Sequence, residues 1–359
     1  MSKSLDIGIV GLPNVGKSTL FNSLTNAGAL VANYPFATIE PNVGIVNVPD
    51  KRLDKLADIY NSEKIVPATV RFVDIAGLVK GASKGEGLGN QFLANIRSCN
   101  AIVQVVRAFK DSSILHVDND HNPNQDIDVI NTELVLADLD TLEKRISKFS
   151  KEVRANAKLQ PMMDMYESAL SHLNNNTPLW STDLNLEDLS DLQLLTAKPI
   201  IYLFNLDENE ISDIELQNKL ENIVKPSPSL FVCAKLENEL SELDEEDKKE
   251  LLESYGLKES GLERLIQKSY ETLGLQSYLT AGPKEVRAWT IKSGSTAPVA
   301  AGVIHTDFEK GFIAAEVVSY KDLIECGSLV NARSKGLARI EGKTYILKPD
   351  DVVEFRFNN

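Results

Sequence analysis

The sequence predicts an α/β protein of several domains, and three patterns support this prediction. A glycine-rich loop at residues 11–18 lies between an apolar run typical of a buried strand and a segment typical of a helix. Residues 131–196 carry apolar side chains at the alternating spacings of three and four that favour packed helices. Residues 281–357 contain short β-branched runs around one short helix, which indicates a small mixed sheet.

Length and composition are those of a globular protein with two or three domains. The chain has 359 residues, more than one ordinary core accommodates, and 43% of them are hydrophobic. Its three cysteines, Cys99, Cys233 and Cys326, are far apart and odd in number, which favours reduced thiols over a disulfide framework. Without a CxxC pair, and with four scattered histidines, a zinc site is not expected.

Charge and hydropathy indicate where in the cell the protein is expected and which classes of partner it is expected to lack. The segment Met1–Asp6 is polar and lacks the features of a signal peptide, and no apolar run reaches the about 18 residues that span a bilayer. The expected location is therefore the cytoplasm, with no membrane partner. The net charge of -14 argues against DNA binding, so any RNA contact requires a local basic patch. Nothing in the sequence demands more than a monomer.

The glycine-rich loop has the chemistry of a phosphate site. Residues 11–18 read GLPNVGKS, which fits GxxxxGK[ST] between a predicted strand at Leu5–Val10 and a helix that starts at Ser18. Backbone N–H groups and the helix N-terminus attract phosphate, and the Lys17 ammonium adds a positive charge. The Ser18 hydroxyl is a predicted Mg²⁺ ligand. Asn14 is a candidate ligand for K⁺ beside the phosphates.

A second strand supplies the predicted acid of the site. Residues 70–77 read VRFVDIAG, so that Asp74 ends a strand and is placed to hold Mg²⁺ through water. The Gly77 amide is predicted to sense the γ-phosphate, and Lys17, Asp74 and Gly77 form the predicted catalytic set. Thr38 ends a loop that the γ-phosphate would order, where it is a third Mg²⁺ ligand or, alternatively, a strand-edge residue.

Two further strand ends are predicted to meet the base. The strand at Pro199–Phe204 ends in Asn205-Leu-Asp-Glu208, where GTPases of the P-loop class carry Asn-Lys-x-Asp, and Cys233-Ala-Lys235 replaces Ser-Ala-Lys. An ionised Glu208 can only accept hydrogen bonds, whereas the Asn205 amide can donate and accept, which suits adenine N6 and N7. Leu206 can pack on the base. ATP is favoured, and GTP stays open.

The residue after Gly77 predicts slow turnover. Ras-like proteins have glutamine there to orient the attacking water, and this chain has Leu78. Leucine cannot hold water, so either another group positions it or catalysis waits for a partner or a rearrangement.

These motifs resemble those of the Obg-like ATPases of the YchF type. The resemblance rests on residues 11–19, on Pro41-Asn42, on FVDIAGLVKGASKGEGLGN at 72–90 and on IHTDFEKGF at 304–312, and it covers essentially the whole chain. It implies a Ras-like P-loop NTPase domain, an inserted coiled-coil hairpin and a C-terminal TGS domain, with ATP preference and ribosome association. Carried over by position, the phosphate ligands are Asn14, Val15, Gly16, Lys17, Ser18 and Thr19, the Mg²⁺ ligands include Ser18 and Thr38, and the base contacts are Asn205 and Leu206.

The middle of the chain predicts an antiparallel helical hairpin. The expected seam is formed by Val135, Leu139, Leu142, Ile146, Phe149 and Val153 on the first helix and by Met163, Tyr166, Leu170 and Leu173 on the second. A basic island lies near the tip, at Lys144, Arg145, Lys148, Lys151, Arg154 and Lys158. A solvated helix face and a contact with ribosomal RNA are equally weighted interpretations.

The end of the chain predicts a β-grasp module, which the resemblance identifies as TGS. The helix at Gly261–Leu273 is expected to close the nucleotide domain, and Leu279–Pro283 to form the boundary. The expected strands are Val286–Ile291, Ile313–Val318, Lys343–Leu347 and Val352–Phe357, with a helix at Ala300–His305. His305, Asp307 and Glu309 are read as helix-capping residues rather than as a metal cluster.

The predicted function is that of a Mg²⁺-dependent ATPase switch that binds the ribosome. The predicted domains are an OBG-type nucleotide-binding domain at 1–130 and 197–278, the hairpin at 131–196 and the TGS domain at 281–357. The alternatives are an adaptor in which nucleotide binding regulates a protein partner, and a switch that prefers GTP.

Overall fold

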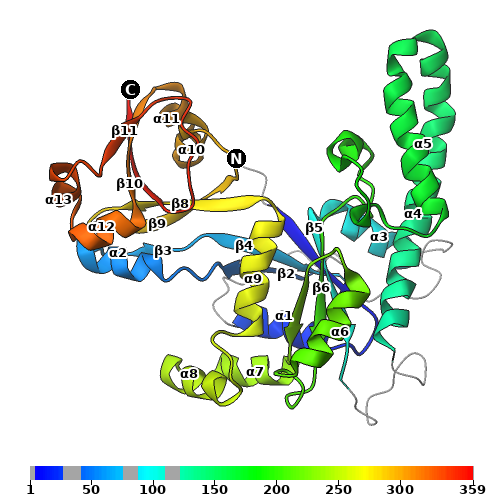
Figure 1. Ribbon diagram of the computed structural model, residues 1–359, viewed down its shortest axis with the longest axis horizontal. Helices are drawn as coiled ribbons and strands as arrows, with labels where there is room; N and C mark the ends of the chain where they lie inside the picture. The colour runs from blue at the N-terminus through cyan, green and yellow to red at the C-terminus, as the bar shows by residue number, and fades with distance from the viewer. Residues whose placement is uncertain (1–4, 27–41, 76–87, 110–121, 359) are drawn as a thin grey trace. The chain divides into compact units, whose positions relative to one another are not determined.

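The computed structural model describes residues 5–26, 42–75, 88–109 and 122–358 (Figure 1). Contacts divide the described residues into two compact units. The first unit lies within residues 5–46 and 71–265, and the second within residues 47–70 and 266–358. The predicted α/β class is confirmed. None of the described helices is long and apolar enough to cross a membrane.

The first unit is built on a six-stranded sheet. Its strand order is β2 (Asn42–Asn47), β4 (Thr69–Asp74), β1 (Asp6–Gly11), β5 (Ala101–Arg107), β6 (Ile200–Asn205), β7 (Ser229–Val232). The pairs β4–β1, β1–β5, β5–β6 and β6–β7 are parallel. Since the carboxyl ends of parallel strands meet at one edge, the loops after these strands gather there.

Helices connect and cover these strands. They are α1 (Lys17–Asn26), α3 (Leu88–Ser98), α6 (Ile214–Val224), α7 (Ala234–Glu242), α8 (Glu245–Ser254) and α9 (Gly261–Thr272), with short 3₁₀ turns at Leu179–Ser181 and Leu186–Leu192. Helix α9 begins in the first unit and ends in the second. A helix is thus present where one was predicted, but from Ile266 on it belongs to the second unit.

The predicted hairpin is present as α4 (Pro123–Ala155) and α5 (Gln160–Asn174), joined by a 3₁₀ turn at Ala157–Leu159. Figure 1 shows the two helices side by side. The ten seam residues named above all lie in one apolar cluster, six of them buried and four partly buried. Within it the rings of Phe149 and Tyr166 meet edge to face at 5.2 Å. The periodicity of the sequence thus predicted this packing.

A buried carboxylate in the middle of α4 binds the segment that precedes β6. Asp138 is fully buried and accepts hydrogen bonds from the N–H groups of Leu195 and Thr196, at 2.8 and 2.7 Å, and from the Thr196 hydroxyl. Burial raises the pKa of Asp138, and these three donors oppose that shift. Three hydrogen bonds therefore link α4 to the segment that precedes β6.

The second unit contains the other six-stranded sheet. Its order is β11 (Arg339–Glu341), β10 (Phe312–Ser319), β12 (Asp351–Phe357), β8 (Leu275–Ala281), β9 (Val286–Lys292), β3 (Ile65–Val66). The helices are α2 (Arg52–Tyr60), α10 (Ala297–Ile304), α11 (Thr306–Lys310), α12 (Tyr320–Cys326) and α13 (Leu329–Ser334). Helix α10 packs on the sheet through small alanines, and the Tyr278 hydroxyl donates to the Ala300 carbonyl at 3.0 Å.

Three features of this unit differ from the expectations. The segment Lys343–Leu347 is not a strand, because its backbone bonds the turn before α10, with the Leu347 N–H donating to the Ser295 carbonyl. Strand β8 occupies Leu275–Ala281, part of which was expected to be a boundary. Strand β3 and helix α2 come from residues 47–70, far away in sequence. His305 caps α11 through the Asp307 N–H, as expected.

Candidate functional site

The phosphate loop has the backbone conformation that its glycines and asparagine allow. Asn14 has a φ of 63° and Gly16 a φ of 93°, both in the left-handed region that favours these residue types. A Cβ atom at Gly16 would lie 2.4 Å from the Asn205 amide nitrogen, so a larger residue does not fit. The loop runs from β1 into α1, where Ser18 and Thr19 are exposed in the first turn.

Asn205 joins the loop to the second predicted base segment. Its side chain is only 3% exposed; its amide nitrogen donates to the Val15 carbonyl at 2.9 Å, and its amide oxygen accepts the Ala234 N–H at 2.9 Å. Val15 and Ala234, 219 positions apart in sequence, are thus held by one amide. One hydrogen and one lone pair of this side chain lie outside these two bonds.

Lys17 and Asp74 form an ion pair beside the loop. Their side chains are 11% and 15% exposed, so the pair is largely shielded from water. Asp74 ends β4, the neighbour of β1, which places its carboxylate at the edge where the phosphate loop begins. The exposed Ser18 hydroxyl and this carboxylate are hard oxygen donors of the kind that Mg²⁺ prefers. The described residues therefore fit a magnesium ion.

A cleft of about 880 Å³, a size typical of ligand sites, opens beside the phosphate loop. Its lining comes from the phosphate loop, from the ends of β5 and β6 and from α7: Asn14, Gly16, Thr19, Phe109, Asn205, Leu206, Asp207, Glu208, Cys233, Ala234, Lys235, Asn238 and Glu239. The structure thus brings the predicted phosphate and base segments together around one cavity.

Phe109 is a residue of this cleft that the sequence reasoning missed. It follows β5, and the Arg107 guanidinium lies 4.5 Å from its ring centroid. Together with Leu206 it gives the cleft an apolar surface beside its polar groups. Its position at the carboxyl end of a central parallel strand was the available signal, because ligands bind at that edge.

Glu208, the acid that was predicted to lie near the base, forms an ion pair with Lys235. The Lys235 ammonium lies 3.1 Å from both carboxylate oxygens of Glu208, and this hydrogen bond and attraction raise the pKa of Lys235. Cys233 is buried before α7, and burial raises the pKa of its thiol. Of the predicted site residues, Thr38 and Gly77 lie outside the described residues, as does Leu78.

A second buried carboxylate lies two residues after Lys235. Glu237, 4% exposed on α7, accepts the Gly261 N–H at the start of α9 at 2.7 Å. Burial raises the pKa of Glu237 to about 7, against the lowering effect of the Gly261 and Leu262 N–H groups. The carboxylate therefore links the base segment to the N-terminus of α9.

This raised pKa predicts a pH-dependent stability. The unfolded chain loses the Glu237 proton near 4.5 and the folded chain near 7, so the unfolding free energy should fall as pH rises through this window. The loss relative to Glu237→Gln should be roughly 3 kcal/mol, measured by urea unfolding at pH 4.5, 6 and 7.5. Glu239→Gln, on the exposed side of α7, is the control. Parallel curves for wild type and Glu237→Gln would contradict this assignment.

Comparisons with known proteins agree with this architecture. The family model described as "50S ribosome-binding GTPase" matches residues 6–161, and YchF-GTPase_C, described as "Protein of unknown function (DUF933)", matches residues 275–358. The "Ribosome-binding ATPase YchF" of Bacillus subtilis (strain 168) is 49% identical over 99% of this chain and 100% of its own length. The protein of that name from Escherichia coli O157:H7 is 50% identical, with 98% of each chain covered.

A solved structure shows the same fold. The Schizosaccharomyces pombe YchF GTPase is 37% identical and superposes with a TM-score of 0.86, covering 99% of this chain and 98% of its own. Because identity near one half extends over almost the whole chain and the fold agrees with a solved relative, this chain belongs to the YchF family.

Proposed function

We propose that this chain is a cytoplasmic, monomeric switch that binds the ribosome and hydrolyses a nucleoside triphosphate slowly, with ATP preferred to GTP. The observation that carries the proposal is the cleft that joins the phosphate loop to the base segments, at the sheet edge where the neighbouring strand β4 ends in Asp74. The relatives named as ribosome-binding ATPases support the ribosome and the nucleotide.

The phosphates would lie on the loop from Asn14 to Thr19, at the N-terminus of α1, whose partial positive charge favours anions. Mg²⁺ would be held by Ser18, Thr38 and Asp74, and it would neutralise negative charge on the phosphate oxygens. Lys17, at the end of the loop, pairs with Asp74. We infer that it exchanges this carboxylate for phosphate oxygens when nucleotide binds, and that Gly77 contacts the γ-phosphate.

The apolar lining and the remaining hydrogen bonds of the cleft favour adenine. Phe109 offers a surface on which a base can pack, and Leu206, which lines the cleft but is only 2% exposed, would meet the base at its edge. The remaining hydrogen and lone pair of Asn205 suit a base edge that accepts and donates. Because Glu208 is held by Lys235, its oxygens are less available for the two donors of guanine. Cys233, Ala234 and Lys235 would complete the base contact.

A titration of ATP and GTP, each with Mg²⁺, tests this assignment. ATP is expected to bind at least about tenfold more tightly, a difference of about 1.4 kcal/mol. Isothermal calorimetry on the full chain measures both constants, and ATP without Mg²⁺ tests the ion. Tighter binding of GTP would mean that Glu208 reads guanine, and the chain would then be a GTP switch with the same architecture.

We propose that the domains follow the predicted boundaries, with the hairpin at 131–196 and the TGS domain at 281–357. We also propose that the hairpin contacts the ribosome and that the bound nucleotide controls this contact. The basic residues Lys148 and Lys151 of α4 are exposed and make no ion pair with any residue that the structure describes. Lys144 and Arg145, in contrast, pair with Asp140 and Glu152. Two lysines three positions apart lie on one helix face, where they can contact neighbouring phosphates.

Reversing both charges, with Lys148→Glu and Lys151→Glu, should weaken co-pelleting with ribosomes at least about threefold. Loss of two phosphate contacts should also reduce the slope of log affinity against log salt by about 2. The control is Lys248→Glu with Lys249→Glu on α8, which changes the net charge equally at one partly exposed and one exposed lysine. Equal pelleting of both variants and the wild type would remove the hairpin from the ribosome contact.

A further inference from the structure

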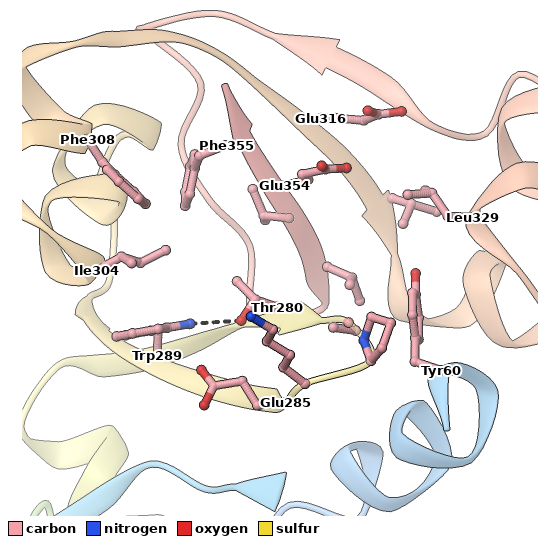
Figure 2. Close-up of a pocket in the computed structure, with 17 residues that line it drawn as sticks. Tyr60, Thr280, Glu285, Trp289, Ile304, Phe308, Glu316, Leu329, Glu354 and Phe355 are labelled. Carbon is pink, nitrogen blue, oxygen red and sulfur yellow. Dashed lines mark hydrogen bonds between the residues drawn. The ribbon is translucent and has the colours of Figure 1, made fainter. Parts of the chain in front are cut away.

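A cavity lies in the second unit, between strands β8 and β12 of its sheet (Figure 2). Strands β8 and β12 run parallel, and Val352 and Leu279 are the one register pair that they share among the described residues. Beyond this pair the strands enclose a cavity of about 610 Å³, within the usual range for ligand sites. Thr280 and Ala281 line one side of it, and 353–355 the other.

The cavity has two lobes because side chains alternate along β12. Phe355 faces the core that α10 covers, and an aromatic lobe forms there with Trp289, Ile304 and Phe308. Glu354 pairs in register with Glu316 and faces the opposite side of the sheet. The second lobe is lined by Tyr60, Glu316, Leu329 and Glu354. Figure 2 shows the aromatic group on one side of the strand, with Tyr60, Glu316 and Leu329 on the other.

Existing contacts hold the walls of the aromatic lobe. The Trp289 indole N–H donates to the Thr280 hydroxyl at 2.9 Å, and the Arg287 guanidinium lies 4.6 Å from the Trp289 ring centroid. Phe308 stacks on Phe357 at 3.7 Å. Little side-chain ordering would therefore be needed when a ligand enters.

Three carboxylates and the ammonium of Lys284 line the cavity. Each carboxylate already faces an arginine: Glu316 is 5% exposed and shared by Arg333 and Arg356, Glu285 is 37% exposed with Arg287 at 3.5 Å, and Glu354 has Arg333 at 3.4 Å. Glu354 is 65% exposed, the most of the three, and lies in the second lobe. It is therefore the carboxylate that a basic group of a ligand would reach.

The edge of β12 that faces β8 is suited to binding an extended peptide. One edge pairs with β10 along the whole strand, from Phe357 to Asp351. On the edge towards β8, no strand among the described residues pairs with β12 beyond Val352. Backbone N–H and C=O groups at such an edge are a template for another strand, and an added strand places its side chains alternately on the two faces.

We propose that this cavity binds a short extended peptide of a partner protein by strand addition to β12. An apolar or aromatic side chain would enter the lobe of Trp289 and Phe308, and the neighbouring basic side chains would face Glu354. This site goes beyond the proposed nucleotide chemistry and does not depend on it, because every wall belongs to the second unit.

The test uses the full chain and a fluorescein-labelled peptide with a central phenylalanine, arginine on either side and threonines outside. Binding is followed by fluorescence anisotropy. Gly282→Trp fills the cavity lining; a Cβ at Gly282 meets nothing within 4 Å, so the backbone tolerates it. Gly342→Trp is the matched control, equally open and outside the cavity. Glu354→Lys tests the charge, with Glu325→Lys, also exposed, as its control.

Gly282→Trp and Glu354→Lys should each weaken peptide binding at least tenfold, while both controls stay within twofold and all four variants keep the wild-type melting temperature. A peptide with glutamate for both arginines, or with proline on either side of the phenylalanine, should lose binding. No binding of the arginine peptide, or equal binding by Gly282→Trp, would overturn the proposal. Equal binding of the proline peptide would also overturn strand addition. So would a result in which the wild type binds free adenosine but no peptide, and Gly282→Trp does not bind adenosine.

Discussion

Lys17→Ala is expected to lower nucleotide hydrolysis by a factor on the order of 100 to 1,000. Removing one preorganised donor from a site that stabilises developing charge has an effect of this size. Here the loss is compounded, because the Asp74 carboxylate, 15% exposed, would keep its charge beside the phosphate loop without the ammonium that neutralises it. Single-turnover hydrolysis of radiolabelled ATP measures the chemical step apart from product release.

The matched variants separate charge from folding. Lys17→Ala combined with Asp74→Ala removes both members of the ion pair, so it should regain part of the nucleotide affinity that Lys17→Ala loses but not the hydrolysis. Lys219→Ala, on the exposed side of α6, should behave as the wild type. If Lys17→Ala hydrolysed ATP within threefold of the wild-type rate, the phosphate loop would not be the catalytic site.

Patterns within short stretches of sequence predicted the hairpin and the buried strands, because the spacing of apolar side chains determines these elements. The seam of the hairpin followed from side chains repeated every three or four residues, since a helix turns every 3.6 residues. The strands that end in Asp74 and Asn205 were also predicted, because an apolar run followed by polar residues is typical of a buried parallel strand. For the same reason Asn205 and Leu206 of the candidate cleft could be named from their positions at a strand end, whereas Phe109, which follows β5, was missed.

The features that depend on distant segments could not be predicted. The pairing of β3 with β9 joins Ile65 to Val286, and nothing near either residue indicates the other. Residues 343–347 have strand propensity, but their backbone bonds the turn before α10 rather than a neighbouring strand. Propensity describes how a segment fits a pleated surface and not whether a partner strand lies beside it.

The role of Asn205 shows the same limit within the site. Sequence reasoning assigned its amide to the base, because an amide matches the adenine edge. The structure shows that the amide first bonds two backbone groups, the Val15 carbonyl and the Ala234 N–H. Those partners lie 190 and 29 residues away, so no local pattern contains them. The base contact stays a prediction, and it would use only the remaining hydrogen and lone pair.

Asn205→Ala is therefore expected to affect stability and nucleotide affinity together. The substitution would leave the Val15 carbonyl and the Ala234 N–H without their partner in a buried region, at a cost of about 1–3 kcal/mol for each group. The phosphate loop and the start of α7 would no longer be held together, so ATP affinity should fall about 100-fold, or about 2.7 kcal/mol. Urea unfolding and calorimetric ATP titration measure the two effects.

Asn205→Asp distinguishes the two hydrogen bonds. Its carboxylate can still accept from the Ala234 N–H, but it cannot donate to the Val15 carbonyl and would place a negative charge 2.9 Å from that oxygen. We expect it to bind ATP at least as weakly as Asn205→Ala, because the charge also repels phosphate. Asn209→Ala, exposed on the same loop, should change neither quantity. If Asn205→Asp kept wild-type ATP affinity, the bond to Val15 would not organise the phosphate loop, and the bond from the Ala234 N–H would be sufficient.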